Sequence, residues 1–320
     1  MNHIYIHCPH LPDEQYRLVL DRLCPETVRN ITVYTQFAPD VAPEQIEAMV
    51  QVQKDFAQHK PIRFQNHAVF AQLPRFRKAL RKVLIKNNFI VELQVQKEQA
   101  PQLVKIVQRL EKSAIIHRIC LDERQDQEGA YRLFATQGLH LCFDNPIYTA
   151  QTPELFDKWL YDPAARGVNT FTDIIHMLTL QSRSPNCRHA SCFGSVFRVD
   201  EALNVYLCPY CVDDRTRLGS LQQADSLNEL LNCQAVADLL PDVVQKRQHC
   251  SESCAGFAHC QGGCPLEALS ADECRHYTAT VDRIRQRLLE VYREGKLAQV
   301  NYIVKNAILN ALAFGTAFFN

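Results

Sequence analysis

The chain has 320 residues, enough for about two domains with cores of their own, which excludes a miniprotein held together by disulfides. Lys plus Arg equals Asp plus Glu at 35 each, so the net charge of zero gives no indication of a nucleic-acid or anionic-membrane partner. No run reaches the roughly 18 apolar residues of a membrane span, and the first residues lack the pattern of a secretory signal. We therefore expect a cytoplasmic protein with no nucleic-acid partner and no membrane partner.

Six short apolar runs alternate with helical patterns through the first half of the chain. Such alternation, at about 25 to 30 residues per unit, is typical of a parallel sheet covered by helices. The sequence therefore predicts an α/β fold that begins with a partial (β/α)6 TIM-like barrel. The expected strands lie at residues 4–8, 31–35, 62–64, 89–95, 115–121 and 139–143.

Polar residues follow several of these expected strands. In parallel sheets ligands bind at the carboxyl ends of the strands, so Asp122, Asp144 and His67 are candidates for acid or base groups. The alternative is that Asp and similar residues only end strands and begin turns, and this is the interpretation we favour. A glycine-rich phosphate loop in this half is excluded, because no glycine precedes Gly129.

Cysteines crowd into one later segment. Ten of the 14 lie between Cys187 and Cys274, and in a reducing compartment such density indicates metal or cluster binding. Eight of them would make two sets of four thiolates. A [4Fe–4S] cluster takes four Cys ligands, but so does tetrahedral zinc, and the count alone leaves both open. The eight are Cys187, Cys192, Cys208, Cys250, Cys254, Cys260, Cys264 and Cys274.

Three segments of this region, in order, resemble the SPASM domain, an auxiliary iron–sulfur module at the carboxyl end of radical SAM enzymes that modify peptides. They are CFGSVFRVDEALNVYLC, LGSLQQADSLNELL and CSESCAGFAHCQGGCP, within about residues 187–277. Two positions depart from the family pattern. Leu203 stands where the family usually has Gly, and three residues separate Cys250 from Cys254 where two are commoner.

The resemblance implies two [4Fe–4S] clusters with interleaved ligands. The first would use Cys187, Cys192, Cys208 and Cys264, and the second would use Cys250, Cys254, Cys260 and Cys274. Gly262 and Gly263 would allow the tight turn that directs the sulfur of Cys264 away from Cys260. Cys211 is interpreted as a spare thiol beside Cys208, and Cys233 as a buried free thiol.

A barrel followed by a SPASM module resembles a radical SAM enzyme, but the catalytic motif of that family is missing. The family holds its SAM-cleaving cluster with CxxxCxxC after the first strand, whereas IYIHCPHLPDEQY supplies only Cys8. The Gly-Gly-Glu motif after the second strand is replaced by VYTQFAPD. We therefore interpret the first half as a degenerate radical SAM barrel, a pseudoenzyme scaffold to which no SAM is expected to bind.

The resemblance predicts an accessory iron–sulfur protein for the maturation of ribosomally made peptides. Its partners would be a modifying enzyme, such as a complete radical SAM protein, and a precursor peptide. Two alternatives remain open: a stand-alone peptide-modifying or redox enzyme that uses these clusters, and a structural binding module held by zinc. The expected parts are the barrel at 1–180, the SPASM domain at 181–277 and C-terminal helices at 278–320.

Two surfaces near the carboxyl end have competing interpretations. Val304, Ala307, Ile308 and Ala311 share one helical face, which would either dock a partner or pack back on the fold. The arginines between residues 277 and 293 alternate with acidic residues, which favours a solvated face.

Overall fold

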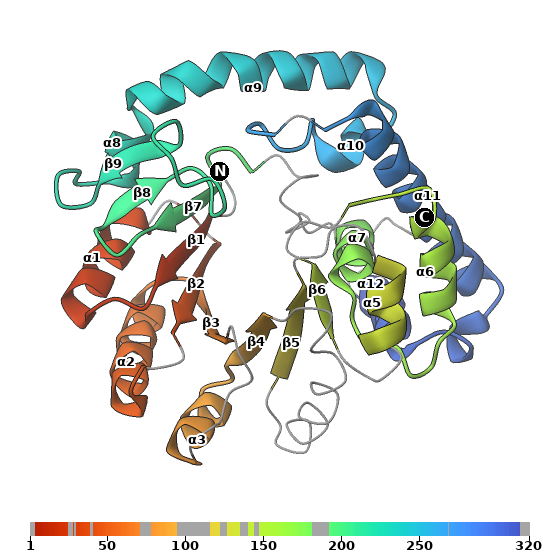
Figure 1. The fold of residues 1–320 in the computed structure, drawn as a ribbon, viewed down its shortest axis with the longest axis horizontal. Coiled ribbons are helices and arrows are strands. Elements are labelled where there is room, and N and C mark those ends of the chain that lie inside the picture. Colours follow the sequence, from red (N-terminus) through yellow and green to blue (C-terminus); the bar gives the residue numbers. More distant parts are fainter. Residues whose placement is uncertain are drawn as a thin grey trace. The chain divides into compact units, whose positions relative to one another are not determined.

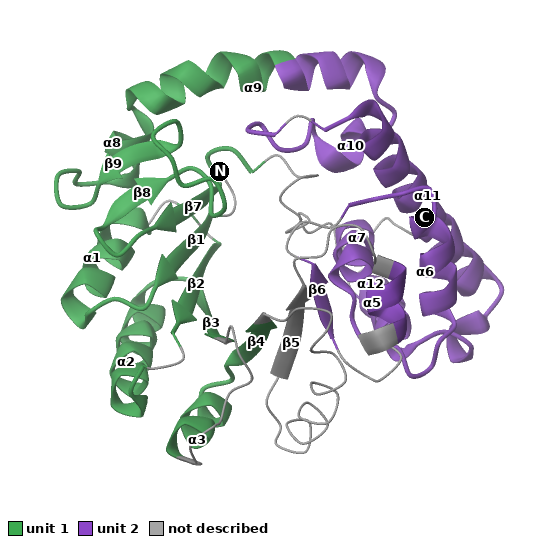
Figure 2. Cartoon of the chain, viewed as in Figure 1, with its two compact units in different colours: residues 1–93, 110–117, 192–245 green, residues 94–109, 118–191, 246–320 purple. Residues whose placement is uncertain are grey.

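The computed structural model divides the chain into two compact units, which are coloured separately in Figure 2. Unit 1 comprises residues 1–93, 110–117 and 192–245, and unit 2 comprises residues 94–109, 118–191 and 246–320. The structure describes residues 4–24, 28, 30–38, 41–70, 78–94, 116–121, 127–134, 140–143, 147–180, 192–267 and 269–313. One boundary between the units falls inside the helix α9 (Gln234–Ser253). Each unit combines several separate segments of the chain, so this division does not test the three consecutive parts expected from the sequence, and they stay a prediction.

Unit 1 is built on a sheet in the order β4-β3-β2-β1-β7-β8-β9 (Figure 1). Strands β1 to β4 pair in parallel, and β7 joins β1 in parallel before an antiparallel hairpin leads to β8 and β9. The strands are β1 (Ile4–Pro9), β2 (Ile31–Phe37), β3 (Ile62–Phe70), β4 (Ile90–Gln94), β7 (Val196–Val199), β8 (Asn204–Tyr206) and β9 (Arg217–Ser220). The helices wholly within this unit are α1 (Asp13–Leu23), α2 (Pro43–His59), α3 (Lys78–Lys86) and α8 (Leu227–Leu231).

The two faces of this sheet differ in chemistry. Ile4, Ile6 and Cys8 of β1 are buried, at most 3% exposed, on the face that packs against the helices that follow β1 and β2. Because side chains alternate along a strand, Tyr5 and His7 lie on the opposite face. The pairing of the neighbouring strands continues this second face across the sheet. The second face is rich in polar and aromatic side chains.

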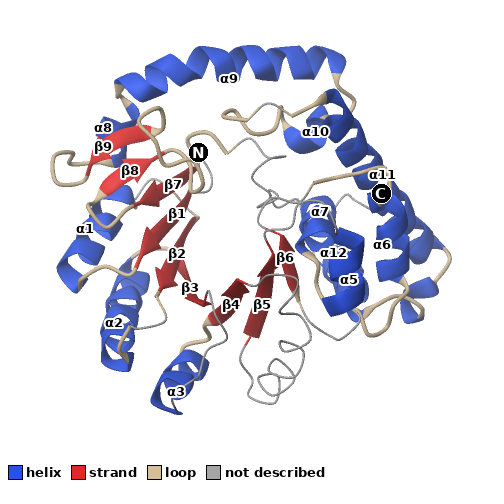
Figure 3. Ribbon diagram, in the orientation of Figure 1, coloured by secondary structure: helices blue, strands red, loops and turns tan. Residues whose placement is uncertain are grey.

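Unit 2 is mainly helical (Figure 3). It contains most of β5 (Ile116–Leu121), which pairs in parallel with β6 (Leu141–Phe143). Its core is apolar and includes Phe156, Trp159, Phe171, Ile284 and Val304, each fully buried. The helices of this unit are α5 (Gln127–Phe134), α6 (Thr152–Leu160), α7 (Asn169–Leu180), α10 (Phe257–Cys260), α11 (Ala271–Arg293) and α12 (Tyr302–Ala313), with a short 3-10 helix at Lys296–Ala298.

The six strands predicted from apolar runs are all present, and their pairings within each unit are parallel. The carboxyl-terminal face formed by Val304, Ala307, Ile308 and Ala311 is buried, and α12 packs against α7. Asn301 fixes the start of this helix, because its side chain donates to the carbonyl of Trp159 at 2.8 Å. Packing against the fold is therefore the interpretation that the structure confirms for this face.

The prediction of a solvated arginine face on α11 was wrong in part. Arg283 and Arg287 both donate to the carboxylate of Asp157 in α6, with Nε to Oδ1 distances of 3.2 and 3.0 Å. Burial alone raises the pKa of Asp157, but the hydrogen bonds from Arg287 and Arg283 outweigh it and lower the pKa. Alternating charge does not distinguish solvated arginines from two that share one carboxylate on a neighbouring helix.

Among the described residues, no helix combines the length and the apolar character that crossing a membrane requires.

Candidate metal centre

Four of the predicted cluster ligands lie along one short stretch of unit 2. Cys250 is in the last turn of α9, and the amide of Cys254 bonds the carbonyl of Cys250 at 2.9 Å. Cys260 ends α10, and Cys274 lies in the first turn of α11, its amide 3.1 Å from the carbonyl of Ser270. All four side chains are partly exposed. A loop between helix ends can thus present several sulfurs, as a cluster site requires.

The electrostatics of these sulfurs show that they lie near one another. Burial raises the pKa of Cys274, and the thiolates of Cys260, Cys254 and Cys250 raise it further. The pKa of Cys260 is also raised, first by burial and then by Cys254 and Cys250. Thiolates that lie near one another repel when no cation is present. Bound iron would remove this repulsion and so stabilise the folded loop. The donor set of the second predicted cluster therefore fits an iron–sulfur group.

The turn that follows Cys260 is made by three residues in the left-handed region. Gln261, Gly262 and Gly263 have φ of 51°, 95° and 68°, and Cys264 follows in a buried position. A Cβ on Gly262 would also lie 3.3 Å from the side chain of Arg247. The glycines predicted to permit this turn are thus needed for both its dihedral angles and its close approach to α9.

Lys246 ties the cysteine loop to α9. Its ammonium group donates to the carbonyl of Cys264 and to the carbonyl of Glu267, the second at 2.9 Å. The same charge lowers the pKa of Cys274, although burial and the neighbouring thiolates outweigh it. Lys246 could not be identified from the sequence, because a lysine in a helical pattern gives no sign of carbonyls that lie 18 or more residues later.

Gly256 lies close to α11. A Cβ at this position would overlap with the hydroxyl oxygen of Thr278. That hydroxyl donates to the carbonyl of Cys274 at 2.9 Å. Ser270 and Glu273 form a capping box that begins α11 and sets the position of Cys274 in its first turn. This Ser-x-x-Glu pattern is visible in the sequence and could have located the start of the helix.

Cys192 and Cys208 flank the β7–β8 hairpin of unit 1. Asp200 holds the hairpin, accepting from the amides of Ala202 and Asn204 at 2.9 and 2.8 Å. Leu203 has φ of 64°, the left-handed conformation that favours glycine, and its side chain is 2% exposed. This is the position where the resembled family usually has Gly. The chain therefore keeps the backbone of the expected turn and uses the leucine side chain in its core.

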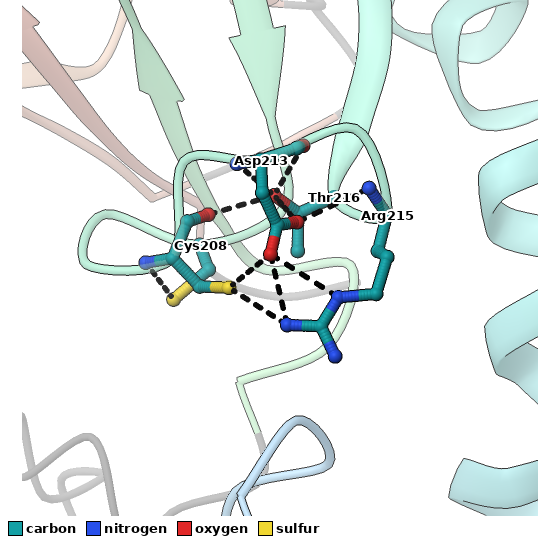
Figure 4. A network of polar contacts seen from close by, with 5 residues as sticks. Cys208, Asp213, Arg215 and Thr216 are labelled. Carbon is teal, nitrogen blue, oxygen red and sulfur yellow. Dashed lines mark hydrogen bonds and ion pairs between the residues drawn. The ribbon is translucent and has the colours of Figure 1, made fainter.

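The sulfur of Cys208 accepts two backbone hydrogen bonds. The amides of Tyr210 and Cys211 lie 3.4 and 3.3 Å from Sγ, and such bonds stabilise a thiolate or a thiolate ligand. Cys211 itself donates from its thiol to Asp213 at 3.3 Å, and Arg215 approaches both. Figure 4 shows Arg215, Asp213 and Thr216 gathered in this network. Burial raises the pKa of Cys211, and its bond to Asp213 raises it further, which favours the interpretation of a spare thiol.

The first predicted ligand set is only partly described. Cys187 lies outside the described residues, Cys192 and Cys208 belong to unit 1, and Cys264 belongs to unit 2. The set therefore stays a prediction. Among the residues that the structure describes, no three His, Cys, Asp or Glu side chains are grouped to hold one metal ion. A four-iron cluster differs in this respect, because each thiolate binds a separate iron and the ligands stand further apart.

The cysteine of the first strand is part of the core. Cys8 lies within β1, 3% exposed, with its sulfur 3.8 Å from the hydroxyl of Thr35. The hydroxyls of Thr35 and Tyr16 are 2.8 Å apart, and Gln53 of α2 donates to that of Tyr16 at 3.0 Å. Burial raises the pKa of Cys8 to about 12. A thiol that is sealed beneath helices and resists ionisation is poorly suited to bind iron.

The candidate acid and base groups of the first half have different outcomes. Asp122 and Asp144 lie outside the described residues. His67 is on β3, and its Nδ1 lies 2.8 Å from a carboxylate oxygen of Glu92 on β4. The contact of Glu92 with His67 could not be predicted from the sequence, because it depends on how β3 and β4 pair.

No protein family model matches the chain. Over 149 residues, 45% of this chain and 37% of the relative, it is 25% identical to the cysteine-type anaerobic sulfatase-maturating enzyme of Clostridium perfringens. The match thus covers little more than a third of that enzyme's length.

Solved structures show the same fold over nearly the whole chain. The histidine-tagged form of anSMEcpe with bound AdoMet matches with a TM-score of 0.66 at 16% identity, covering 96% of this chain and 98% of that one. Native anSMEcpe with bound AdoMet and the Cp18Cys peptide matches with a TM-score of 0.64 at 17% identity, covering 96% and 99%. At such identities the likeness establishes the fold alone. The chain is therefore a mixed α/β protein with the fold of these structures, and part of it is similar in sequence to an anaerobic sulfatase-maturating enzyme.

Proposed function

We propose that the chain is an accessory iron–sulfur protein that carries two auxiliary [4Fe–4S] clusters and assists a modifying enzyme in the maturation of a peptide. The proposal rests on one contrast. Several cysteines near the carboxyl end lie close to one another at helix ends, whereas the cysteine of the first strand is buried in the core. Burial and the neighbouring thiolates raise the pKa of Cys260 and of Cys274 in the late loop, whereas Cys8 is a core side chain. The family relation and the peptide-bound structures of the same fold support the peptide partner.

The clusters would supply electron storage or transfer and would also fix the loops that hold them. The second would be held by Cys250, Cys254, Cys260 and Cys274, and the first by Cys187, Cys192, Cys208 and Cys264. Lys246 would place a positive charge beside the second site, because it already holds the carbonyls of Cys264 and Glu267. The hydrogen bonds of Lys246 hold the loop against α9. Cys264 is buried in this loop, 4% exposed.

We propose that the chain does not cleave SAM. Solved structures of the same fold hold AdoMet, so a likeness of fold gives no reason to expect its absence. The reason comes from the residues, because Cys8 has no partners at the CxxxCxxC spacing and faces the helices. No bound SAM is predicted for the same reason, together with the missing Gly-Gly-Glu motif.

The test is an anaerobic SAM-cleavage assay on the reconstituted full chain with a strong reductant. We expect no release of methionine above the level given by a Cys8→Ala variant. Methionine release by the wild-type chain that Cys8→Ala abolishes would contradict the proposal. It would favour the alternative of a stand-alone peptide-modifying or redox enzyme.

A zinc-stapled binding module is the second alternative, favoured by the ability of four thiolates to hold zinc. It predicts colourless protein with stoichiometric zinc after anaerobic reconstitution with iron, sulfide and zinc together. The iron–sulfur proposal predicts brown protein under the same conditions.

A further inference from the structure

Arg198 links the sheet of unit 1 to the loop that begins at Cys208. It lies in β7 between Phe197 and Val199, which are both fully buried in the core. Because side chains alternate along a strand, Arg198 lies on the opposite face of the sheet. Its guanidinium donates from Nη1 to the carbonyl oxygen of Pro209 at 2.7 Å. This hydrogen bond therefore joins a strand to the residue that directly follows a predicted cluster ligand.

The carbonyl that Arg198 holds belongs to the same peptide group as the amide of Tyr210. This group is trans, and in a planar trans peptide the C=O and the N–H point in opposite directions. A donor that fixes the oxygen on one side therefore also fixes where the hydrogen points on the other side. The amide nitrogen of Tyr210 lies 3.4 Å from Sγ of Cys208 and donates to it.

The hydrogen bond from Arg198 also strengthens this amide as a donor. A charged donor polarises the peptide group, and hydrogen bonds that are linked in this way strengthen one another. Cys208 is 4% exposed, so its sulfur is largely shielded from water. Hydrogen bonds to the sulfurs of an iron–sulfur cluster favour its more negatively charged, reduced state and so raise its reduction potential.

We infer that Arg198 is a positioning residue for the first cluster. It holds the carbonyl of Pro209 so that the amide of Tyr210 donates to the sulfur of Cys208, which raises the reduction potential of that cluster. The inference rests on the proposed function, in which Cys208 is a ligand of the first cluster.

A second arginine of the same hairpin provides a matched comparison. Arg217 of β9 is exposed, and its Nη2 donates to the side-chain oxygen of Asn204 at 2.7 Å. It carries the same charge as Arg198 but bonds a different group. Substitution of each arginine by Met therefore distinguishes loss of the hydrogen bond to Pro209 from loss of one positive charge in the hairpin.

The first readout is hydrogen exchange of the Tyr210 amide in the full chain without clusters, labelled with 15N-tyrosine. Tyr210→Phe identifies the signal. Arg198→Met keeps a long apolar side chain but cannot donate, so exchange should become about tenfold faster. Arg217→Met should leave the rate unchanged, and Arg198→Lys, which keeps a charged donor, should restore part of the protection. A rate that Arg198→Met leaves unchanged would overturn the inference.

The second readout is the reduction potential of the first cluster, from anaerobic titration of the reconstituted chain with dithionite. The titration uses a Cys260→Ser background, because the second set then keeps only three of its four thiolates. Arg198→Met should lower the equilibrium constant for reduction about tenfold, which is about 59 mV for a one-electron couple. Arg198→Lys should give an intermediate potential, and Arg217→Met should match the parent.

Iron content separates failure of this inference from failure of the proposed function. About four irons per chain in every variant, with the same potential in Arg198→Met and the parent, would overturn the inference alone. Equal shifts in Arg198→Met and Arg217→Met would also overturn it, because charge would then explain both. Loss of iron in Arg198→Met would show that Arg198 only maintains the fold. A parent chain without iron would overturn both the inference and the proposed function.

Discussion

Cys8 and Cys24 in unit 1 and the cysteines of the α9–α11 loop in unit 2 have opposite surroundings. The two early thiols are buried among strands and helices, and burial raises the pKa of each to about 12. Of the later ones, Cys250, Cys254, Cys260 and Cys274 are partly exposed, and the charges of the first three raise the pKa of Cys274. A cysteine packed in a core contributes as a small apolar side chain, whereas several that face one another without a cation are arranged for a ligand.

The largest expected effect is on iron content. Cys260→Ser should remove one cluster and lower iron from about eight to about four per chain, because the second set then keeps only three of the four thiolates that hold its cluster. Cys8→Ser should leave the iron content unchanged, because its sulfur faces the core. Iron and acid-labile sulfide analysis of anaerobically reconstituted protein is the measurement. Equal losses in the two variants would remove the distinction between the two groups.

A second effect concerns the polar face of unit 1, where we expect the stability of the folded protein to depend on pH through His7. Burial, then the charges of His67 and Arg198, lower the pKa of His7 to about 4. Since the unfolded value is near 6.5, the stabilisation is complete above pH 6.5 and is lost as pH falls towards 4, by up to about 3 kcal/mol.

The check is urea unfolding of the wild type and His7→Asn at several pH values. The variant should lose less stability than the wild type over this range. His59→Asn, at an exposed position, serves as the matched control. A His7→Asn protein with the wild-type pH dependence would show that His7 is not the group responsible.

A third effect concerns packing beneath the cysteine loop. Gly256→Ala places a Cβ against the hydroxyl of Thr278 and should destabilise the protein by about 1–3 kcal/mol. Thermal unfolding measures it, and Thr278→Ala in the same chain should restore part of the loss. No restoration by the second substitution would mean that the close contact is not the cause.

The smallest effect is at the junction of α6 and α11. Asp157→Asn should cost about 1–2 kcal/mol at pH 7, because two arginines lose a charged acceptor. The pKa of Asp157 is lowered, so this contribution is present above about pH 4 and is lost as pH falls below it. Denaturant unfolding of Asp157→Asn and of Glu47→Gln, whose partner Lys86 is exposed, gives the comparison. Similar costs in both would contradict the role of Asp157 as an acceptor shared by two arginines.

The sequence was informative where local patterns decide the structure. Apolar runs located all six parallel strands, and the glycines before Cys264 located its turn. The departure at Leu203 was visible, but its φ of 64° depends on the hairpin that Asp200 holds. Contacts set by tertiary packing could not be predicted, such as His67 with Glu92 across β3 and β4, or Lys246 with carbonyls of the later loop.

The most direct test is the number of irons per chain after anaerobic reconstitution with excess iron and sulfide. Two late cubes and no cluster near Cys8 predict about eight irons and eight sulfides. About twelve of each would show a third cluster and contradict the account, and stoichiometric zinc without sulfide would contradict it from the other side.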